Sequence, residues 1–568
     1  MNQELLSDPR LNKAFVLHTD DLEVFSRMPE VHALVTFSPY IYEHIRAYSK
    51  DIRVIYPLDA TSTTDTLLDD SVREAQQAAL HLSDCVSRVV NAPHIDYWQG
   101  DFYNYLHSYI RRWSEIARNF SRLAPKGKFF IPAIQNYAWR YGYHSAVPSL
   151  ALRTELGKEL NIEEISYRQD TSRHLPGLPL SLAGQGESET VSLAYSPATS
   201  THVDLVQGML DKSTITIQSA YYHTRYRSDM EIGLQRVSNS ERANIIREFS
   251  RAGINLSSLF HEICDYLLGD VPFGKAIVRQ QSSLFCSDFV YQVILWRFLS
   301  RSFSVSSLSK ILISGHFTPF HGPIISLAGV LGCNVTVVPH SYHQNNPFPP
   351  LPNLKFLSDP SQNYYWDRFS REWVRTLPFG RESEQACIEK PGLSSGWSLK
   401  RVTLVLNGMC HTHTCFTDMR LYLDGLASII HHCASKNIEV LIRPKPSENC
   451  SALVVDSLPE VNGYFKLSTS KTLEEDLREA DLVILYDWPS SAGVQALRLG
   501  RPLVACAHTT LNNNLIGVFD RLLVARMSVL ELLAKIDTWV VNSEQFTSFF
   551  VRQRLNFSAS VAISQDTR

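Results

Sequence analysis

The segment 481–504 constrains the fold of this chain more than any other stretch. The apolar run Leu482–Leu485 is too short for a helix and suits a strand that is buried on both faces. Ser490 or Ser491 can cap a helix that ends at Gly500, and Pro502 leads into a second strand. The pattern predicts a strand–helix–strand unit of a parallel sheet. It fits equally an ordinary unit with a serine cap and a unit whose helix N-terminus binds phosphate.

Length and composition restrict the class of protein. A chain of 568 residues is too long for one core and indicates two large domains or three smaller ones. Hydrophobic content of 44% and aromatic content of 11% are typical of a globular protein. The 54 Lys and Arg residues nearly balance the 57 Asp and Glu residues, and a formal charge of −3 argues against a general nucleic-acid binder.

The sequence contains no sign of export or of membrane insertion. No apolar run approaches the roughly 20 residues that span a bilayer. The first eight residues lack the basic and apolar regions of a signal peptide, and the ten Cys residues form no paired framework. We therefore expect a cytoplasmic protein with reduced thiols, and peripheral membrane contact stays open.

The N-terminal part alternates between predicted strands and helices. A helical repeat of apolar residues covers 101–123, and 240–303 is mostly helical in pattern. The Pro-, Gly- and Ser-rich run 175–198 predicts a long surface loop or an insertion boundary. Because strands alternate with helices, we expect a parallel α/β sheet. The predicted strands of this part are 14–17, 33–37, 52–56 and 129–132.

A second strand–helix–strand unit follows at 310–340. Its strands precede His316 and His340, and its helix is entered near His321. Ligands of open α/β sheets lie at the carboxyl ends of the strands, so these histidines are candidates for chemistry. The ordinary alternative is that each caps a loop or satisfies a buried carbonyl.

A third group of elements begins after the proline-rich stretch 345–359. A strand ends at Asn407-Gly408, an amphipathic helix covers 418–435, and the next strand ends in the turn Arg443-Pro444-Lys445-Pro446. A short helix at 473–480 then leads into the segment 481–504. This order predicts a Rossmann-like domain from about 398 to 510.

The order of motifs resembles that of GT-B glycosyltransferases, most closely those of bacterial surface polysaccharides. Ala328–His340 resembles the Ala-x-x-x-Gly-x-x-x-x-x-x-x-His pattern that ends their N-domain. The turn Arg443–Pro446 occupies the place of the Arg/Lys-x-His-Pro turn of enzymes with cytidine-activated donors, with Lys445 in place of His. Ser490–Leu497 matches Ser-Ser-x-Gly-x-Glu-Ala-Leu, with Gln495 in place of Glu.

This resemblance implies an α/β chain of two Rossmann-like domains that face a cleft. The implied parts are an acceptor domain with a helical insertion (1–345), a linker (346–397), a nucleotide-sugar domain (398–545) and a tail (546–568). The implied reaction moves an acidic sugar of the Kdo or sialic type from a CMP-activated donor to a growing bacterial surface glycan. The implied partners are the nucleotide sugar and a glycan or lipid-linked glycan acceptor, and no nucleic acid is expected. The implied location of the protein is the cytoplasm, with peripheral contact to the inner membrane left open.

The resemblance also implies roles for particular residues. A general base of the N-domain would deprotonate the acceptor hydroxyl, and the donor phosphate would meet cations, hydroxyls and backbone amides. No aspartate-rich metal motif is present, so we expect neither a metal nor a cofactor besides the donor. The candidate bases are His321, His340, His316, Asp20 and Asp21. The candidate donor-binding residues are Asn407, Gly408, Arg443, Lys445, Pro446, Ser490, Ser491, Gly493 and Gln495.

Other functions stay open at this point. The chain can use another nucleotide donor such as UDP, transfer a CDP-linked polyol phosphate, or act as a sugar-nucleotide epimerase of similar fold. Lys445 and Gln495 also fit a non-catalytic protein of this fold, because both depart from the motifs. The cluster Cys410–Cys415 lacks the second ligand pair typical of zinc sites, which favours a polar loop. The patch at 223–227 fits an acidic ligand or a solvated turn.

Overall fold

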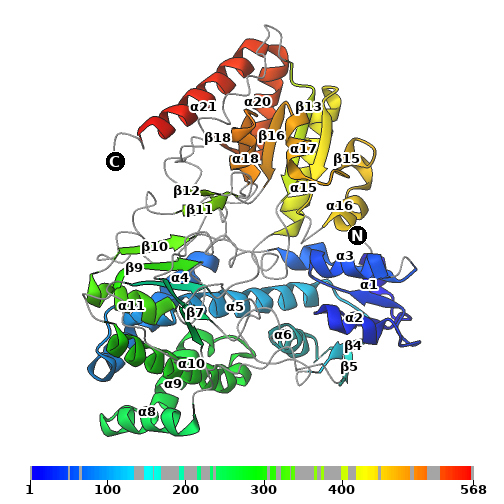
Figure 1. Ribbon diagram of the computed structural model, residues 1–568. Coiled ribbons are helices and arrows are strands. Elements are labelled where there is room, and N and C mark those ends of the chain that lie inside the picture. Colours follow the sequence, from blue (N-terminus) through cyan, green and yellow to red (C-terminus); the bar gives the residue numbers. More distant parts are fainter. Residues whose placement is uncertain are drawn as a thin grey trace. The chain divides into compact units, whose positions relative to one another are not determined.

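The structure is a computed structural model of the chain, which divides into two compact units (Figure 1). The first unit comprises Met1–Leu68, Ser108–Asp170 and Arg381–Arg568, and the second comprises Asp69–His107 and Thr171–Gly380. The structure describes residues 3–48, 51–62, 67–133, 146–157, 159–167, 191–196, 214–218, 230–233, 238–303, 308–314, 321–332, 334–338, 364–367, 372–375, 398–406, 418–445, 450–486, 492–507 and 525–563.

The first sheet belongs to the first unit, has the order β3-β2-β1-β4-β5, and is parallel throughout. Its first four strands confirm the four strands expected from the N-terminal sequence. They are short and almost wholly buried, as is typical of a sheet covered on both faces. The strands are β1 (Lys13–Phe15), β2 (Ala33–Val35), β3 (Arg53–Ile55), β4 (Lys128–Pro132) and β5 (Asn161–Ile165).

Helices connect these strands as the sequence predicts. The expected helix at 101–123 is α5 (Gly100–Arg122), and Phe120 on it packs edge-to-face against Phe15, Phe37 and Phe129. The remaining helices up to residue 170 are α1 (Gln3–Ser7), α2 (Thr19–Phe25), α3 (Pro39–Tyr48), η1 (Leu58–Thr61), α4 (Leu67–Val90), η2 (Ile95–Trp98) and α6 (Val147–Leu156).

The second sheet lies in the second unit, has the order β10-β9-β6-β7-β8, and is also parallel. Its strand β6 (Val191–Ser196) falls within the stretch predicted to be a surface loop, so that expectation was wrong for these residues. Proline, glycine and serine around β6 conceal its period of two. The other strands are β7 (Thr214–Gln218), β8 (Met230–Gly233), β9 (Leu308–Ser314) and β10 (Asn334–Val338).

The helices of the second unit confirm the helical pattern of 240–303 and the strand–helix–strand unit of 310–340. Trp98 packs against Phe289 and Trp296 and donates a hydrogen bond to Ser326 Oγ at 2.9 Å, which ties η2 to α10 and α11. The helices are α8 (Asn239–Arg251), α9 (Leu256–Leu268), α10 (Gly274–Ser302) and α11 (His321–Leu331). The range predicted as a linker holds an antiparallel pair, β11 (Tyr364–Asp367) and β12 (Glu372–Arg375).

The third sheet belongs to the first unit and has the order β15-β14-β13-β16-β17-β18, parallel throughout. Counted in chain order, this is 3-2-1-4-5-6, the Rossmann order. The predicted Rossmann-like domain is therefore confirmed, and β18 extends it beyond 510. The strands are β13 (Arg401–Leu406), β14 (Glu439–Arg443), β15 (Phe465–Leu467), β16 (Leu482–Tyr486), β17 (Leu503–Ala507) and β18 (Ala525–Ser528).

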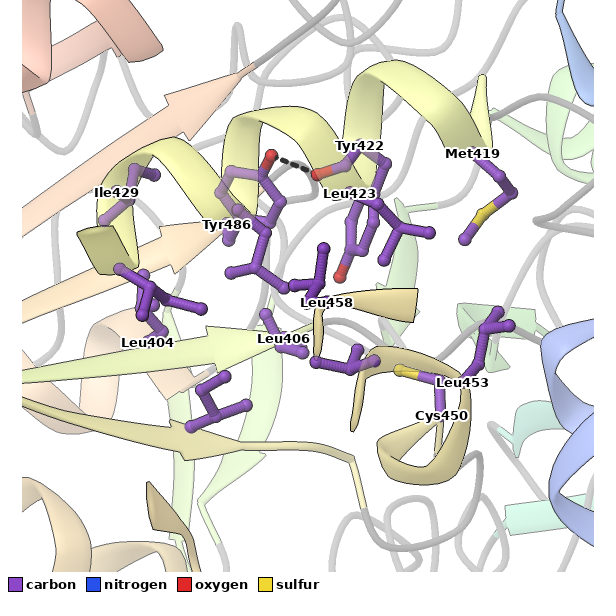
Figure 2. Packing of buried hydrophobic residues seen from close by; sticks show 14 of the residues in the cluster. Leu404, Leu406, Met419, Tyr422, Leu423, Ile429, Cys450, Leu453, Leu458 and Tyr486 are labelled. Carbon is purple, nitrogen blue, oxygen red and sulfur yellow. Dashed lines mark hydrogen bonds between the residues drawn. The ribbon is translucent and has the colours of Figure 1, made fainter. Parts of the chain in front are cut away.

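A continuous apolar core joins this sheet to the helix that follows β13 (Figure 2). Leu404 and Leu406 of β13 face Leu423 and Ile429 of the helix, all of them nearly inaccessible to solvent. The helices of this region are α15 (Met419–Ser435), α16 (Ser451–Ser457), η7 (Pro459–Val461), α17 (Leu473–Glu479), α18 (Ala492–Arg498), α20 (Val529–Val541) and α21 (Ser543–Ile563).

The fold class expected from the sequence, α/β with Rossmann-like parallel sheets, is confirmed. The described residues form three such sheets, because 13–165 and 191–338 each form their own. Read from β8, the second sheet has the same 3-2-1-4-5 order as the first. The boundaries 1–345, 346–397, 398–545 and 546–568 stay predictions, as does a cleft between two domains.

Candidate functional site

The third sheet has its topological switch point between β13 and β16. In chain order these are the first and fourth strands. The chain continues from β13 to β14 toward one edge of the sheet, and from β16 to β17 toward the opposite edge. Leu406 and Tyr486 are paired in register, so both strands end at the same level. Asn407-Gly408 follows one of these strands and Ser490-Ser491 lies four and five residues beyond the other. Ligands of open α/β sheets bind at such a point, at the carboxyl edge.

Several predicted donor-binding residues lie outside the described residues, namely Asn407, Gly408, Pro446, Ser490 and Ser491. Among the others, Lys445 is exposed after the end of β14. Gly493 is buried and Gln495 is partly exposed, both within α18. The structure thus places these three residues on segments that follow the carboxyl ends of β14 and β16.

Arg443, the last residue of β14, has a buried guanidinium. Its Nη1 donates to Ser468 Oγ at 2.8 Å, to the carbonyl oxygen of Ser470 at 2.7 Å and to Asp476 Oδ2 at 2.9 Å. These contacts tie the end of β14 to the segment after β15 and to α17. The buried ion pair with Asp476 and the bonds to Ser468 and Ser470 give Arg443 a structural role. Its contact with a nucleotide stays a prediction.

The first sheet places Asp20 and Asp21 just beyond the carboxyl end of β1. Asp21 is fully buried, its Oδ2 accepts from the backbone amides of Leu17 and His18 at 2.7 Å each, and Tyr167 donates to its Oδ1. Asp21 therefore has the geometry of a capping residue. Asp20 differs because its side chain is 52% exposed.

His18 is a neighbour of this pair that the sequence analysis did not single out. It is the N-cap of α2, and its Nδ1 accepts a hydrogen bond from the backbone amide of Asp20 at 3.2 Å. A neutral imidazole that accepts at Nδ1 carries its proton on Nε2. A histidine placed directly after a short apolar strand and before two aspartates was the signal in the sequence.

His316, His321 and His340 belong to the second unit. Ser314 of β9 is paired in register with Val338 of β10. His316 and His340 each lie two residues further along the chain than their member of this pair. His316, His340 and the His321 side chain lie outside the described residues, although His321 opens α11. The compact unit that holds the third sheet therefore contains Asp20 and Asp21 but none of these histidines.

Within the first unit, segments from the carboxyl ends of two sheets contact one another. Arg420, at the start of α15, lies 2.5 Å from Asp59 of η1, which follows β3. Asp456 of α16, the helix after β14, accepts from Tyr42 of α3 at 2.9 Å, and α3 follows β2. Buried residues of both sheets also form one hydrophobic cluster. The edge where the third sheet would bind a ligand thus adjoins the corresponding edge of the first.

Two features of the described residues bear on the predicted membrane contact and on metal binding. No helix in the described part of the chain is long and apolar enough to cross a membrane. Those residues also contain no group of three or more His, Cys, Asp and Glu side chains arranged to hold a metal ion. The cluster Cys410–Cys415 and the patch at 223–227 lie outside them.

The sequence matches no protein-family profile and no curated protein. Among the solved structures that are similar to the chain at low sequence identity are the following three. A UDP-forming α,α-trehalose-phosphate synthase from Burkholderia xenovorans is 9% identical over 66% of this chain and 98% of its own, with a TM-score of 0.31. MurG from Acinetobacter baumannii is 11% identical over 66% and 99%, with a TM-score of 0.32. A UDP-N-acetylglucosamine 2-epimerase from Listeria monocytogenes, so named provisionally, is 9% identical over 66% and 91%, with a TM-score of 0.30. Because all three TM-scores lie below 0.5, neither the fold nor the activity of this chain is inferred from these structures.

Proposed function

We propose that this chain is a glycosyltransferase that binds a nucleotide-sugar donor at the carboxyl edge of the third sheet. The observation that carries the proposal is the 3-2-1-4-5-6 order of that sheet, with the predicted phosphate loops following the two strands at its switch point. Each loop has the small or hydroxylated residues that let backbone amides and hydroxyls approach a phosphate. The exposed Lys445 adds a cation after the neighbouring strand.

The donor that we propose is a CMP-activated acidic sugar of the Kdo or sialic type. The support is the series of motifs in the sequence, since Arg443–Pro446 and Ser490–Leu497 follow the order of enzymes with cytidine-activated donors. The acceptor would be a growing bacterial surface glycan, free or lipid-linked, reached from the cytoplasmic face of the inner membrane.

The proposed chemistry is a displacement at the anomeric carbon. A general base takes the proton of the acceptor hydroxyl, the hydroxyl oxygen bonds to the anomeric carbon, and the bond to the donor phosphate breaks with its electrons moving to the phosphate. Lys445 and the loops after β13 and β16 would stabilise the charge on the leaving nucleotide. Asp20 is the candidate base in the same compact unit, and His316, His321 and His340 are the candidates in the other.

Calorimetric titration with CMP, CDP, UDP and GDP tests the donor site. We expect CMP to bind tightest, and the Ser490→Ala/Ser491→Ala double variant to weaken CMP about 10-fold or more, because even one hydroxyl bond to a charged phosphate contributes about 1.5–3 kcal/mol. Ser428→Ala is the matched control, since Ser428 is an exposed serine that bonds only its own helix among the described contacts. Binding of none of the four nucleotides would contradict the proposal.

Release of nucleotide in the presence of acceptor tests the reaction. Incubation of CMP-linked sugars with a lipid-linked glycan extract should release CMP and lengthen the glycan, and Asp20→Asn should slow this step if Asp20 is the base. A sugar isomer formed without acceptor would instead identify an epimerase.

A further inference from the structure

The helix α16 starts eight residues after the last residue of β14, and Lys445 lies between the two in the chain. Its N-cap residue, Cys450, makes no side-chain hydrogen bond to the first turn. The first backbone N–H groups of a helix have no partner within the helix, and an uncapped end is unfavourable unless another group accepts from them. The start of α16 therefore depends on an acceptor from elsewhere.

Glu43 of α3 provides that acceptor from the neighbouring sheet. Its Oε1 accepts from the backbone amide of Ala452. The two partners are 409 residues apart in the chain. A carboxylate at this place also interacts favourably with the positive end of the helix dipole.

The same face of α3 holds the other end of α16. Tyr42 donates to Asp456 Oδ2 at 2.9 Å, and Arg46 Nε lies 3.1 Å from the same oxygen. Asp456 is in the last turn of the helix, where a negative charge is unfavourable without a cation. Tyr42, Glu43 and Arg46 lie within about one turn of α3, and through them α3 contacts both ends of α16.

Partial burial of the Glu43 carboxylate costs desolvation free energy that an apolar packing residue would not. Its carboxyl is half-buried, and burial raises its pKa, while the backbone amides of Ala452 and Leu453 lower it in part. The charged or titratable groups around it are Asp456, His44, Tyr42, Arg46 and the Cys450 thiol. An apolar side chain would fill the space at a smaller desolvation cost. What the carboxylate adds is a directional bond to the amide of Ala452.

We propose that Glu43 is a positioning residue for the donor site: by capping α16 from the first sheet, it fixes the start of the helix that follows Lys445 in the chain. This inference rests on the proposed function, because it assigns Lys445 a use in donor binding. The first sheet would then influence donor affinity through Glu43, although Glu43 itself touches no substrate.

Amide hydrogen exchange and nucleotide titration of three variants test the inference. Glu43→Ala should accelerate exchange at Ala452 and Leu453 about 10-fold or more, leave exchange in β16 within about 2-fold, and weaken CMP about 3- to 10-fold. Glu43→Gln should restore most of both, because its amide oxygen can still accept. Glu30→Ala, an exposed glutamate with no described partner, is the control.

The outcomes separate this inference from the proposed function. Wild-type protein that binds no nucleotide contradicts the proposed function, and the exchange rates then still decide whether Glu43 holds α16. Tight CMP binding that Glu43→Ala leaves unchanged overturns the positioning role. Exchange that rises equally in α16 and β16 would show a loss of global stability instead, and it also overturns the inference.

Discussion

Tyr486 donates a hydrogen bond to the backbone carbonyl of Tyr422 at 2.6 Å, and the two rings lie 4.9 Å apart (Figure 2). Tyr486 is the last residue of β16, and Tyr422 lies in the first turns of α15. The contact joins the strand that precedes the Ser-Ser loop to the helix that follows the Asn-Gly loop. It therefore fixes two of the supports of the candidate donor site to each other.

Removal of this hydroxyl should weaken both the fold and the candidate donor site. We expect Tyr486→Phe to lower the free energy of unfolding by about 1 kcal/mol, because Tyr422 is helical and its carbonyl keeps a helix partner. CMP affinity should fall with it by a few-fold. Urea denaturation and calorimetry measure the two quantities. Tyr464→Phe, at a tyrosine that is 54% exposed, is the control and should change neither.

Gly425 is the residue that lets the hydroxyl approach the helix. A Cβ at this position would lie 2.5 Å from Tyr486 Oη and 3.2 Å from Val529 Cγ2. Gly425→Ala should therefore destabilise the protein by about 1–3 kcal/mol, despite the higher helix propensity of alanine. Gly329→Ala in α11 meets only ordinary contacts at 3.5 Å and beyond, and should instead stabilise by about 0.5–1 kcal/mol. Thermal unfolding distinguishes the two signs.

The buried pair of Arg443 and Asp476 should be critical for folding. Their side chains are 9% and 3% exposed, and Asp476 also accepts from Ser468 Oγ at 2.6 Å. Asp476→Ala leaves the guanidinium without its counter-charge and should reduce stability by about 3–5 kcal/mol. Glu474→Ala, in the exposed pair with Arg478, should cost only about 0.3–0.5 kcal/mol in urea denaturation. Similar losses in both variants would contradict the structural role of Arg443.

The raised pKa of Glu43 predicts a pH dependence of stability. A carboxyl whose pKa is higher in the folded state binds its proton more tightly there than in the unfolded chain. Its contribution to stability is thus present below the unfolded pKa and is lost as the pH rises through the folded pKa. The free energy of unfolding of wild type minus that of Glu43→Gln should fall over that range. Asp456, His44, Tyr42, Arg46 and Cys450 face the same site, and the subtraction removes their own titration to first order. A flat difference would contradict burial as the cause.

Much of the fold could be predicted because most elements are marked locally. Apolar runs of four to six residues between turn residues identify β13, β14, β16 and β17, and the helical period identifies α5 and α15. Strands β6, β7 and β8 could not be identified in the same way. Their neighbours are rich in proline, glycine and serine, and they become strands by pairing with β9 and with one another.

Some residues of the candidate site could also be placed from the sequence, whereas their buried hydrogen bonds could not. Residues that follow a clear strand, such as Lys445 and Asp20, could be placed at the carboxyl ends of strands from sequence alone. The buried bonds of Arg443 to Asp476 and of Asp21 to Tyr167 could not, because these partners lie 33 and 146 residues away in the chain.

By itself, the sequence determined the α/β class, the position of most strands and helices, and the order of motifs in the C-terminal domain. These follow from hydrophobic period, caps and turn residues, which act over a few residues. Only the tertiary structure decided that there are three parallel sheets, that Asp20 shares a compact unit with the third sheet, and that Glu43 caps α16. The reason is physical: strand order and side-chain partners depend on contacts between distant segments, and no local pattern encodes which of many apolar strands will pair.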